Sequence, residues 1–262
     1  MLPDFNMIIH KFPEREDITL IPLADVHLGA RECMEQEFIK FIDKIKDEPN
    51  TYLILGGDLI NNSTRSSVGN GVFEEIMRPA DQKKMMAKIL APVAHKILAA
   101  VSGNHERRSG KDADDDPTYD ILCKIDREDV YRENMAFVKL QFGNTEGSGD
   151  RNPTYTLVVT HGAGGGALTS GAVLKGERFG YAIDGMDALI MGHTHKPFIT
   201  QPGKIVIDKL NNKVTVKPFK VINMTSWLEY GGYAAQKMLL PSSHCMHTLT
   251  LRGTRKEMVV TM

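Results

Sequence analysis

Short apolar runs recur along most of the chain, and helically spaced or polar segments separate them. Five of these runs have the length of strands that are buried on both faces. They cover residues 18–24, 52–55, 96–101, 155–159 and 188–191. Strands alternate with helices in the first half, and strands dominate the second half. This order predicts a sheet-rich α/β sandwich with helices on the outside.

The spacing of apolar residues also predicts the remaining elements. Helices are expected over residues 35–46, 73–90 with an interruption near Pro79, 117–125 and 168–181. Further strands are expected at 7–10, 136–142, 205–207, 214–216, 219–222, 248–251 and 258–260. Asn211-Asn212 marks a hairpin between two of them, and residues 143–153 mark another. Because no linker, repeat or change of composition divides the chain, residues 1–262 are expected to form a single domain.

Residues able to bind metal follow each of the five buried runs. They are Asp25 and His27, Asp58, Asn104 and His105, His161, and His193 and His195. Imidazole is the commonest metal ligand among side chains, and ligands in α/β sheets gather at the carboxyl ends of strands. A single His-x-His pair is a weak signal. Five strand ends with the same chemistry predict a metal site.

Three polar segments need separate interpretations. Residues 61–71 form a loop at the same end of the sheet, and this loop is either a substrate rim or a solvated connector. The charged stretch 107–116 is expected to be a solvated face, and Asp114–Asp116 within it is not expected to bind a cation. Gly164-Gly165-Gly166 lacks the Gly-Lys-Ser/Thr ending of a phosphate-binding loop, which excludes that interpretation.

Composition narrows the possible partners and compartment. A formal net charge of -1 argues against a broad nucleic-acid-binding surface, although a local basic patch remains possible. No apolar run approaches the ~20 residues of a membrane span, and the N-terminus lacks the pattern of a secretory signal. Cys33, Cys123 and Cys245 are widely spaced, so a thiolate zinc site is not expected. Free thiols are typical of a reducing compartment, which predicts a cytoplasmic location.

Taken in order, these blocks resemble those of the calcineurin-like metallophosphoesterase superfamily. The superfamily pattern is Asp-x-His, Gly-Asp, Gly-Asn-His-Asp/Glu, a later His, and Gly-His-x-His. The counterparts here are Asp25/His27, Gly57-Asp58, Gly103-Asn104-His105-Glu106, His161 and Gly192-His193-Thr194-His195. The resemblance implies a four-layer α/β/β/α sandwich with a two-metal centre. The first block is most similar to that of DNA repair exonucleases in the superfamily.

The resemblance also implies a role for each matching residue. One metal would be held by Asp25, His27 and His195. The other would be held by Asn104, His161 and His193, and Asp58 would bridge the two. His105 would lie beside the substrate phosphate as a general acid or an oxyanion contact. Four histidines match no block and are expected to be structural or on the surface: His10, His95, His244 and His247.

The implied activity is metal-dependent hydrolysis of a phosphoester. Nitrogen and oxygen ligands without thiolate suit Mn²⁺, Fe or Zn²⁺, and the ligand types do not select among these metals. Mn²⁺ is the expected metal, with Fe or Zn²⁺ as alternatives. Two divalent ions, Asp25, Asp58 and a shared hydroxide leave about one positive charge, which suits a monoanionic diester. We therefore expect a phosphodiesterase, with a nuclease as one form of it. The alternatives are a phosphomonoesterase, for which Arg65, Arg107 and Arg108 are the nearest candidate cations, and a non-catalytic scaffold.

Overall fold

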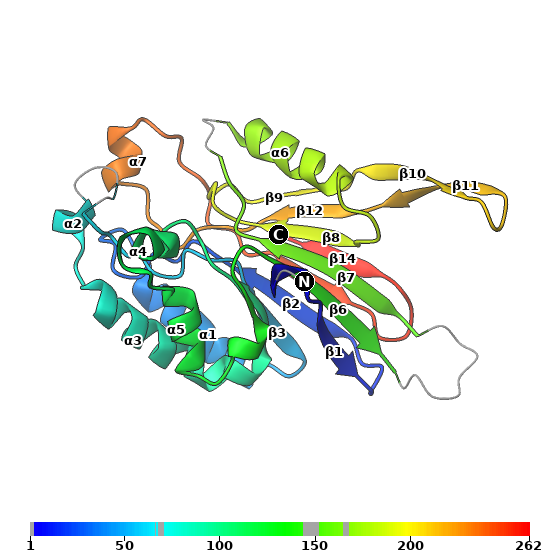
Figure 1. Cartoon of the computed structure of the whole chain (residues 1–262), viewed down its shortest axis with the longest axis horizontal. Helices are drawn as coiled ribbons and strands as arrows, with labels where there is room; N and C mark the ends of the chain where they lie inside the picture. The colour runs from blue at the N-terminus through cyan, green and yellow to red at the C-terminus, as the bar shows by residue number, and fades with distance from the viewer. Residues whose placement is uncertain (1–2, 66, 68–70, 144–151, 165–167) are drawn as a thin grey trace.

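In the computed structural model, residues 3–65, 67, 71–143, 152–164 and 168–262 are described. Two six-stranded sheets stack on each other, and helices cover both outer faces (Figure 1). α1, α3 and α5 lie on one side of the stacked sheets, and α6 lies on the other (Figure 1). The mixed α/β class and the four-layer arrangement expected from the sequence are confirmed.

The sheet under α1 and α3 has the strand order β14-β13-β2-β3-β4-β5. Its strands are β2 (Ile18–Leu23), β3 (Thr51–Leu55), β4 (Ile97–Val101), β5 (Tyr131–Arg132), β13 (Thr248–Leu251) and β14 (Met258–Thr261). β2, β3 and β4 run parallel to one another. Their carboxyl ends therefore meet at one edge of the sheet.

The sheet under α6 has the order β1-β6-β7-β8-β12-β9. Its strands are β1 (Ile8–Phe12), β6 (Met135–Phe142), β7 (Thr154–Thr160), β8 (Ala188–Met191), β9 (Phe198–Thr200) and β12 (Lys220–Asn223). β7, β8 and β12 are parallel. A separate two-stranded ribbon, β10 (Gly203–Asp208) with β11 (Lys213–Pro218), projects beyond this sheet (Figure 1).

Helices flank the two sheets, and the longer ones bury one apolar face each. They are α1 (Glu35–Asp47), α2 (Gly71–Glu74), α3 (Pro79–Leu90), α4 (Glu106–Ala113), α5 (Pro117–Cys123), α6 (Thr169–Tyr181) and α7 (Gly232–Gln236). α1 shows the principle, because Phe38, Ile42 and Ile45 recur at helical spacing and all three are buried. No helix in the described ranges is long and apolar enough to cross a membrane.

One apolar core joins the two sheets. Leu53 and Val101 from the first sheet belong to the same buried cluster as Val138, Leu157 and Ile190 from the second. β8 is buried along its whole length and is a continuous apolar run for this reason, whereas β7 buries the apolar residues Tyr155 and Leu157–Val159 and leaves its threonines partly exposed. The sandwich therefore fixes the strand ends of one sheet against those of the other.

Most predicted elements are present, with bounds shifted by a few residues. The interruption near Pro79 is real, because α2 ends at Glu74 and α3 begins at Pro79. The hairpin loop at 143–153 lies largely outside the described residues, as do two glycines of the run at 164–166.

The interpretation of residues 107–116 as a solvated face is correct only in part, because Lys111 and Asp114 are exposed, whereas Ser109 is buried and Asp115 and Asp116 are half-buried. Most of the segment forms α4, in which Ser109 is buried against Asn62. Asp115 accepts hydrogen bonds from Lys83, and the Asp116 side chain caps α5 through the backbone N–H of Tyr119. These aspartates are occupied by tertiary contacts, which a count of charges along the sequence does not reveal.

Candidate metal centre

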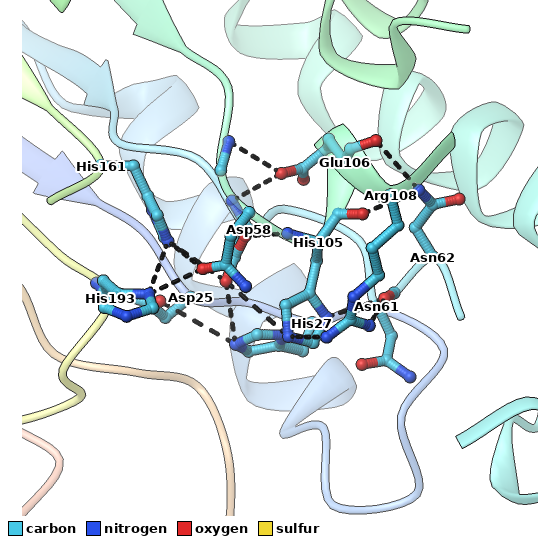
Figure 2. Close-up of polar contacts among 12 residues, drawn as sticks. Asp25, His27, Asp58, Asn61, Asn62, His105, Glu106, Arg108, His161 and His193 are labelled. Atoms are coloured by element: carbon cyan, nitrogen blue, oxygen red, sulfur yellow. Dashed lines mark hydrogen bonds and ion pairs between the residues drawn. The ribbon is translucent and has the colours of Figure 1, made fainter. Parts of the chain in front are cut away.

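The eight candidate residues converge at one place, where strands from both sheets end. Figure 2 shows Asp25, His27, Asp58, His105, His161 and His193 among them. Asp25 and His27 follow β2, Asp58 follows β3, and Asn104 and His105 follow β4. From the other sheet, His161 follows β7, and His193 and His195 follow β8. The fold thus brings together residues that are up to 170 positions apart in the chain.

The backbone at this edge is unusual. A left-handed φ occurs at five of the eight residues, although none of the five is glycine: Asp25, His27, Asp58, His193 and His195. Their φ values lie between 51° and 70°, in a region that costs a non-glycine residue of the order of 1–2 kcal/mol. Such conformations cluster at functional sites, where the surrounding structure enforces them.

The first group of converging atoms comprises side chains of Asp25, His27 and His195. Nε2 of His27 lies 3.2 Å from Nε2 of His195, and Nε2 of His195 lies 3.2 Å from Oδ1 of Asp25. Asp25 and His27 are buried. Oδ2 of Asp25 also accepts the backbone N–H of His193 at 2.9 Å, which fixes the carboxylate.

The second group is formed by Asn104, His161 and His193. Oδ1 of Asn104 lies 2.7 Å from Nδ1 of His193 and 3.0 Å from Nε2 of His161. Nδ1 of His161 faces the carbonyl of Gly56 at 2.8 Å, so this nitrogen carries the proton and Nε2 presents its lone pair to the group.

Asp58 lies between the two groups. Its Oδ2 is 3.3 Å from Nε2 of His161 and 3.8 Å from Nε2 of His27. Its Oδ1 accepts the backbone N–H of His105 at 2.8 Å. Among the described aspartates, Asp58 is therefore the one whose carboxylate faces side chains of both groups.

The spacing of these atoms fits divalent ions. Ligand atoms that share one ion at ~2.1 Å lie about 3.0–3.4 Å apart. The spacing between Nε2 of His27 and Nε2 of His195 falls in this range, as does the 3.3 Å between Nδ1 of His193 and Nε2 of His161. Two facing imidazole nitrogens have two lone pairs and can share only one proton, so a cation satisfies them better than a hydrogen bond does.

Charge interactions inside the site shift several pKa values. Burial alone would raise the pKa of the Asp58 carboxyl, but the histidines around it hold that pKa well below its usual range. Burial opposes a charge on His161, but Asp58 outweighs burial and raises the pKa of His161 to about 9. Burial lowers the pKa of His27 well below its usual value. Without metal, the site therefore holds an ionised Asp58 beside a protonated His161.

His105 belongs to the site but differs from the other histidines. Its Nδ1 faces the carbonyl oxygen of Asn61 at 2.8 Å, and its Nε2 faces the Nη2 of Arg108 at 2.8 Å (Figure 2). Both ring nitrogens are thus engaged by other groups. Nε2 of His105 is also 3.9 Å from Oδ2 of Asp58, at the margin of the cluster.

Glu106 stabilises the two loops that carry Asp58 and Asn104, a role that sequence reasoning missed. This buried carboxylate accepts the backbone N–H groups of Asp58, Leu59, Ile60 and Gly103. Through these bonds it holds the loop after β3 against the loop after β4. The sequence offered Glu106 only as the last letter of a motif block, without a contact to explain it.

The start of the loop at 61–71 packs under the site instead of standing free in solvent. The side chain of Asn62 is buried and donates to the carbonyls of His105 and Glu106 and to Oγ of Ser109. Asn61 offers its carbonyl to His105. Several later residues of the loop lie outside the described ranges, so its role as a substrate rim stays a prediction.

The four unmatched histidines lie outside every group of potential ligands found among the described residues. His10 contacts the carbonyl of Leu98, and His244 contacts the carbonyl of Ser226. These contacts fit the structural role expected of them.

Comparison with known proteins gives three results. Residues 18–197 match the sequence profile of the calcineurin-like phosphoesterases. The DNA polymerase II small subunit of Pyrococcus abyssi is 29% identical over 120 residues, which cover 40% of this chain and 19% of the relative. The Pyrococcus furiosus subunit is 28% identical over the same length. The match thus spans about a fifth of these relatives.

Two solved structures resemble the chain at low similarity. One is a conserved protein of Streptococcus pneumoniae TIGR4 named as a predicted phosphoesterase, with a TM-score of 0.40 and 11% identity over 93% of this chain and 88% of the other. The second is the NAD nucleotidase of Haemophilus influenzae, with a TM-score of 0.39 and 8% identity over 94% of this chain and 49% of the other.

Proposed function

The chain belongs to the calcineurin-like phosphoesterase family. We propose that it is a metal-dependent hydrolase of phosphoesters and that it acts as a phosphodiesterase. The observation that carries the proposal is the charge of the ligand set. Only Asp25 and Asp58 among the eight site residues bear a carboxylate, and Asn104 contributes a neutral oxygen. With two divalent ions and a hydroxide, this set keeps about one positive charge, which matches a monoanionic diester.

The proposal assigns one ion to Asp25, His27 and His195 and the second to Asn104, His161 and His193. Asp58 bridges both. The convergence of these atoms supports the assignment. Mn²⁺ is the proposed metal, since a set that mixes hard oxygen donors with imidazoles and lacks thiolate suits it, as it also suits Fe or Zn²⁺. We also take residues 1–262 as one domain, because a single apolar core contains strands of both sheets.

When bound, two such ions polarise the phosphoryl oxygens and lower the pKa of a shared water toward neutrality. The protein's own residues orient the ligands and supply a proton to the leaving oxygen. The Asp25 carboxylate is held by the backbone N–H of His193, so its direction is fixed before substrate arrives. His105 lies at the margin of the cluster, and its Nε2 would protonate the leaving oxygen when the ring carries a second proton there, a role worth roughly 10²–10⁴-fold in rate.

We propose nucleic acid as one class of diester substrate. Support comes from the similarity of 120 residues to the archaeal polymerase subunits and from the first motif block. Cys33, Cys123 and Cys245 are free thiols, which supports the proposed cytoplasmic location.

A phosphomonoesterase is the second candidate, and a specific contact favours it. The guanidinium of Arg108 lies at the centre, beside His105. A further cation there would favour a dianionic monoester. The nearby carboxylates of Asp115 and Asp116 do not pair with this arginine, because they contact Lys83, Tyr119 and Tyr131 instead.

Matched kinetics separate the two candidates. We expect a higher kcat/KM on bis(p-nitrophenyl) phosphate than on p-nitrophenyl phosphate, measured with the same Mn²⁺-loaded protein at one pH. A clearly higher kcat/KM on the monoester would overturn the diesterase proposal. A variant with His105→Ala should lose activity on both esters while retaining its metal, which checks that the activity belongs to this centre.

A further inference from the structure

Arg108 places a cation at the edge of the metal centre without a carboxylate partner. Its Nη2 donates to Nε2 of His105 at 2.8 Å, and its Nη1 donates to the carbonyl of Asn61 at 3.2 Å. Both acceptors are neutral. Within the described part of the chain, no carboxylate oxygen lies within 4.0 Å of the Arg108 guanidinium. A half-buried cation without a carboxylate in direct contact is compensated only by more distant charges, those of Asp58, Glu106 and Glu75, and direct pairing with an anion would stabilise it further.

The position of Arg108 follows from the first turns of α4. His105 is the residue before α4, and Arg108 lies three positions later, so their side chains are neighbours on the helix surface. Figure 2 shows the Arg108 side chain running back toward His105 and His27. Arg107 behaves differently, because its Nη2 donates to the carbonyl of Ser102.

The hydrogen bonds of His105 show which of its ring nitrogens Arg108 contacts and whether that nitrogen carries a proton. Because Nδ1 of His105 faces a carbonyl oxygen, Nδ1 carries the proton and Nε2 presents a lone pair. Arg108 occupies that lone pair. An imidazole nitrogen is a weaker partner for guanidinium than a phosphoryl oxygen, which is anionic and accepts two parallel N–H groups.

We propose that Arg108 binds a non-bridging oxygen of the substrate phosphoryl group and exchanges its contact with Nε2 of His105 for that oxygen. The exchange leaves Nε2 of His105 free to face the leaving oxygen. Arg108 is thus a substrate-binding residue in the centre to which the proposed function assigns phosphoester hydrolysis. The contact is available to monoesters and to diesters, since both carry non-bridging oxygens.

The location of the guanidinium fits this role. Nε2 of His105, which Arg108 contacts, lies 3.9 Å from Oδ2 of the proposed bridging residue Asp58. The rings of His105 and His27 are 4.3 Å apart between centroids. Only the side chain of His105 therefore separates the guanidinium from the proposed metal positions. The substrate oxygens must lie close to these positions. Burial lowers the pKa of Arg108, against the effect of Asp58, and so adds to the benefit of an anionic partner.

Binding of inorganic phosphate to the Mn²⁺-loaded protein tests the inference without turnover. Titration calorimetry would compare the wild type with Arg108→Ala and Arg108→Lys. Lys111→Ala is the matched control, because Lys111 is an exposed cation of the same helix. We expect Arg108→Ala to weaken phosphate binding by about 10- to 100-fold. The affinity of Arg108→Lys should lie between those of the wild type and Arg108→Ala, because lysine keeps the positive charge but lacks the paired N–H groups of the guanidinium. Lys111→Ala should stay within about twofold of the wild type.

Steady-state kinetics give a second readout. Arg108→Ala should raise KM on bis(p-nitrophenyl) phosphate by a similar factor and lower kcat less. Bound metal, measured by elemental analysis, should be unchanged. The inference is overturned if Arg108→Ala binds phosphate within twofold of the wild type, or if both Arg108 variants lose metal along with phosphate. If the wild type hydrolyses neither ester but binds phosphate through Arg108, the proposed function fails and this inference stands.

Discussion

At the scale of single residues, Glu106 links the two loops that carry Asp58 and Asn104. Its Oε1 accepts the N–H groups of Leu59 and Ile60, and its Oε2 accepts those of Asp58 and Gly103. Burial raises the pKa of Glu106 to about 7, while the four N–H groups favour the ionised carboxylate. An acceptor-only group is required here, because every partner is a donor.

The variant Glu106→Gln should therefore lose stability. A glutamine amide would direct an NH₂ group at two N–H donors, leaving both unsatisfied. We expect the free energy of unfolding to fall by about 2–4 kcal/mol in urea titrations of the metal-free protein. Glu133→Gln, an exposed change of the same chemistry, should shift it by less than about 0.5 kcal/mol. Equal stability of the two variants would contradict the role assigned to Glu106.

Residue type and position identified the candidate ligands because metal chemistry restricts them to a few side chains at strand ends. Asp25, His27 and His195 illustrate this, since each directly follows a recognisable apolar run. Arg108 and Glu106 were harder to interpret, because their roles depend on which atoms face them across the fold. An arginine within a charged stretch looks the same in sequence whether it points to solvent or to a histidine.

At the scale of elements, the close approach of the loops after β3 and β4 shapes the centre. Gly57 has a φ of 87°, and a Cβ placed on it would lie 2.5 Å from the backbone nitrogen of Gly103 and 2.8 Å from the carbonyl carbon of Ser102. Backbone atoms cannot rotate away from such a contact as a side chain could. The spacing between Asp58 and Asn104 therefore depends on glycine at this position.

A pair of identical substitutions tests this dependence. Gly57→Ala should push the two loops apart, weaken Mn²⁺ binding and lower the free energy of unfolding by about 1–3 kcal/mol. Gly171→Ala, in α6, has nothing within 4 Å of the new Cβ and should be neutral or stabilising by up to about 1 kcal/mol. Calorimetric Mn²⁺ titration and urea unfolding would measure both. Unchanged metal affinity in Gly57→Ala would show that the loop spacing does not matter.

Hydrophobic periodicity predicted the elements that bury a large apolar face, including α1 and the buried strands β7 and β8. α4 was not predicted, because its residues Glu106–Ala113 are mostly charged or small and lack an apolar stripe. Its stability comes instead from polar contacts, such as those of Asn62 with Ser109. Helices that are held by tertiary hydrogen bonds leave little trace in the pattern of apolar positions.

At the scale of the whole molecule, the metal centre joins the two sheets. Asp25, His27, Asp58 and Asn104 come from the sheet that contains β2, β3 and β4. His161, His193 and His195 come from the sheet that contains β7 and β8. Ions bound by both sets would link the halves of the sandwich in addition to their shared core. Binding to the folded state alone then adds to global stability.

Metal should therefore stabilise the fold, and more so as pH rises. At about 100 times the dissociation constant, one Mn²⁺ site adds ~2.7 kcal/mol, which corresponds to a rise in Tm of about 5–11 °C for a protein near this size. In the metal-free protein, the proton on His161 stabilises the fold below the ordinary pKa of ~6.5, and this contribution is lost as pH rises through about 9. Metal must displace that proton, so its affinity and the rise in Tm should both increase from pH ~6.5 to ~9.

Thermal unfolding with Mn²⁺ and with a chelator, at several pH values, measures this effect. Asp58→Asn should remove most of the rise in Tm, because the proposed bridging carboxylate contributes to both sites while its Oδ1 contact with His105 can be kept by the amide oxygen. Asp43→Asn, an exposed change on α1, should retain the full rise. A rise in Tm that is equal at pH ~6.5 and ~9, or that survives in Asp58→Asn, would contradict metal binding across the two sheets at this centre.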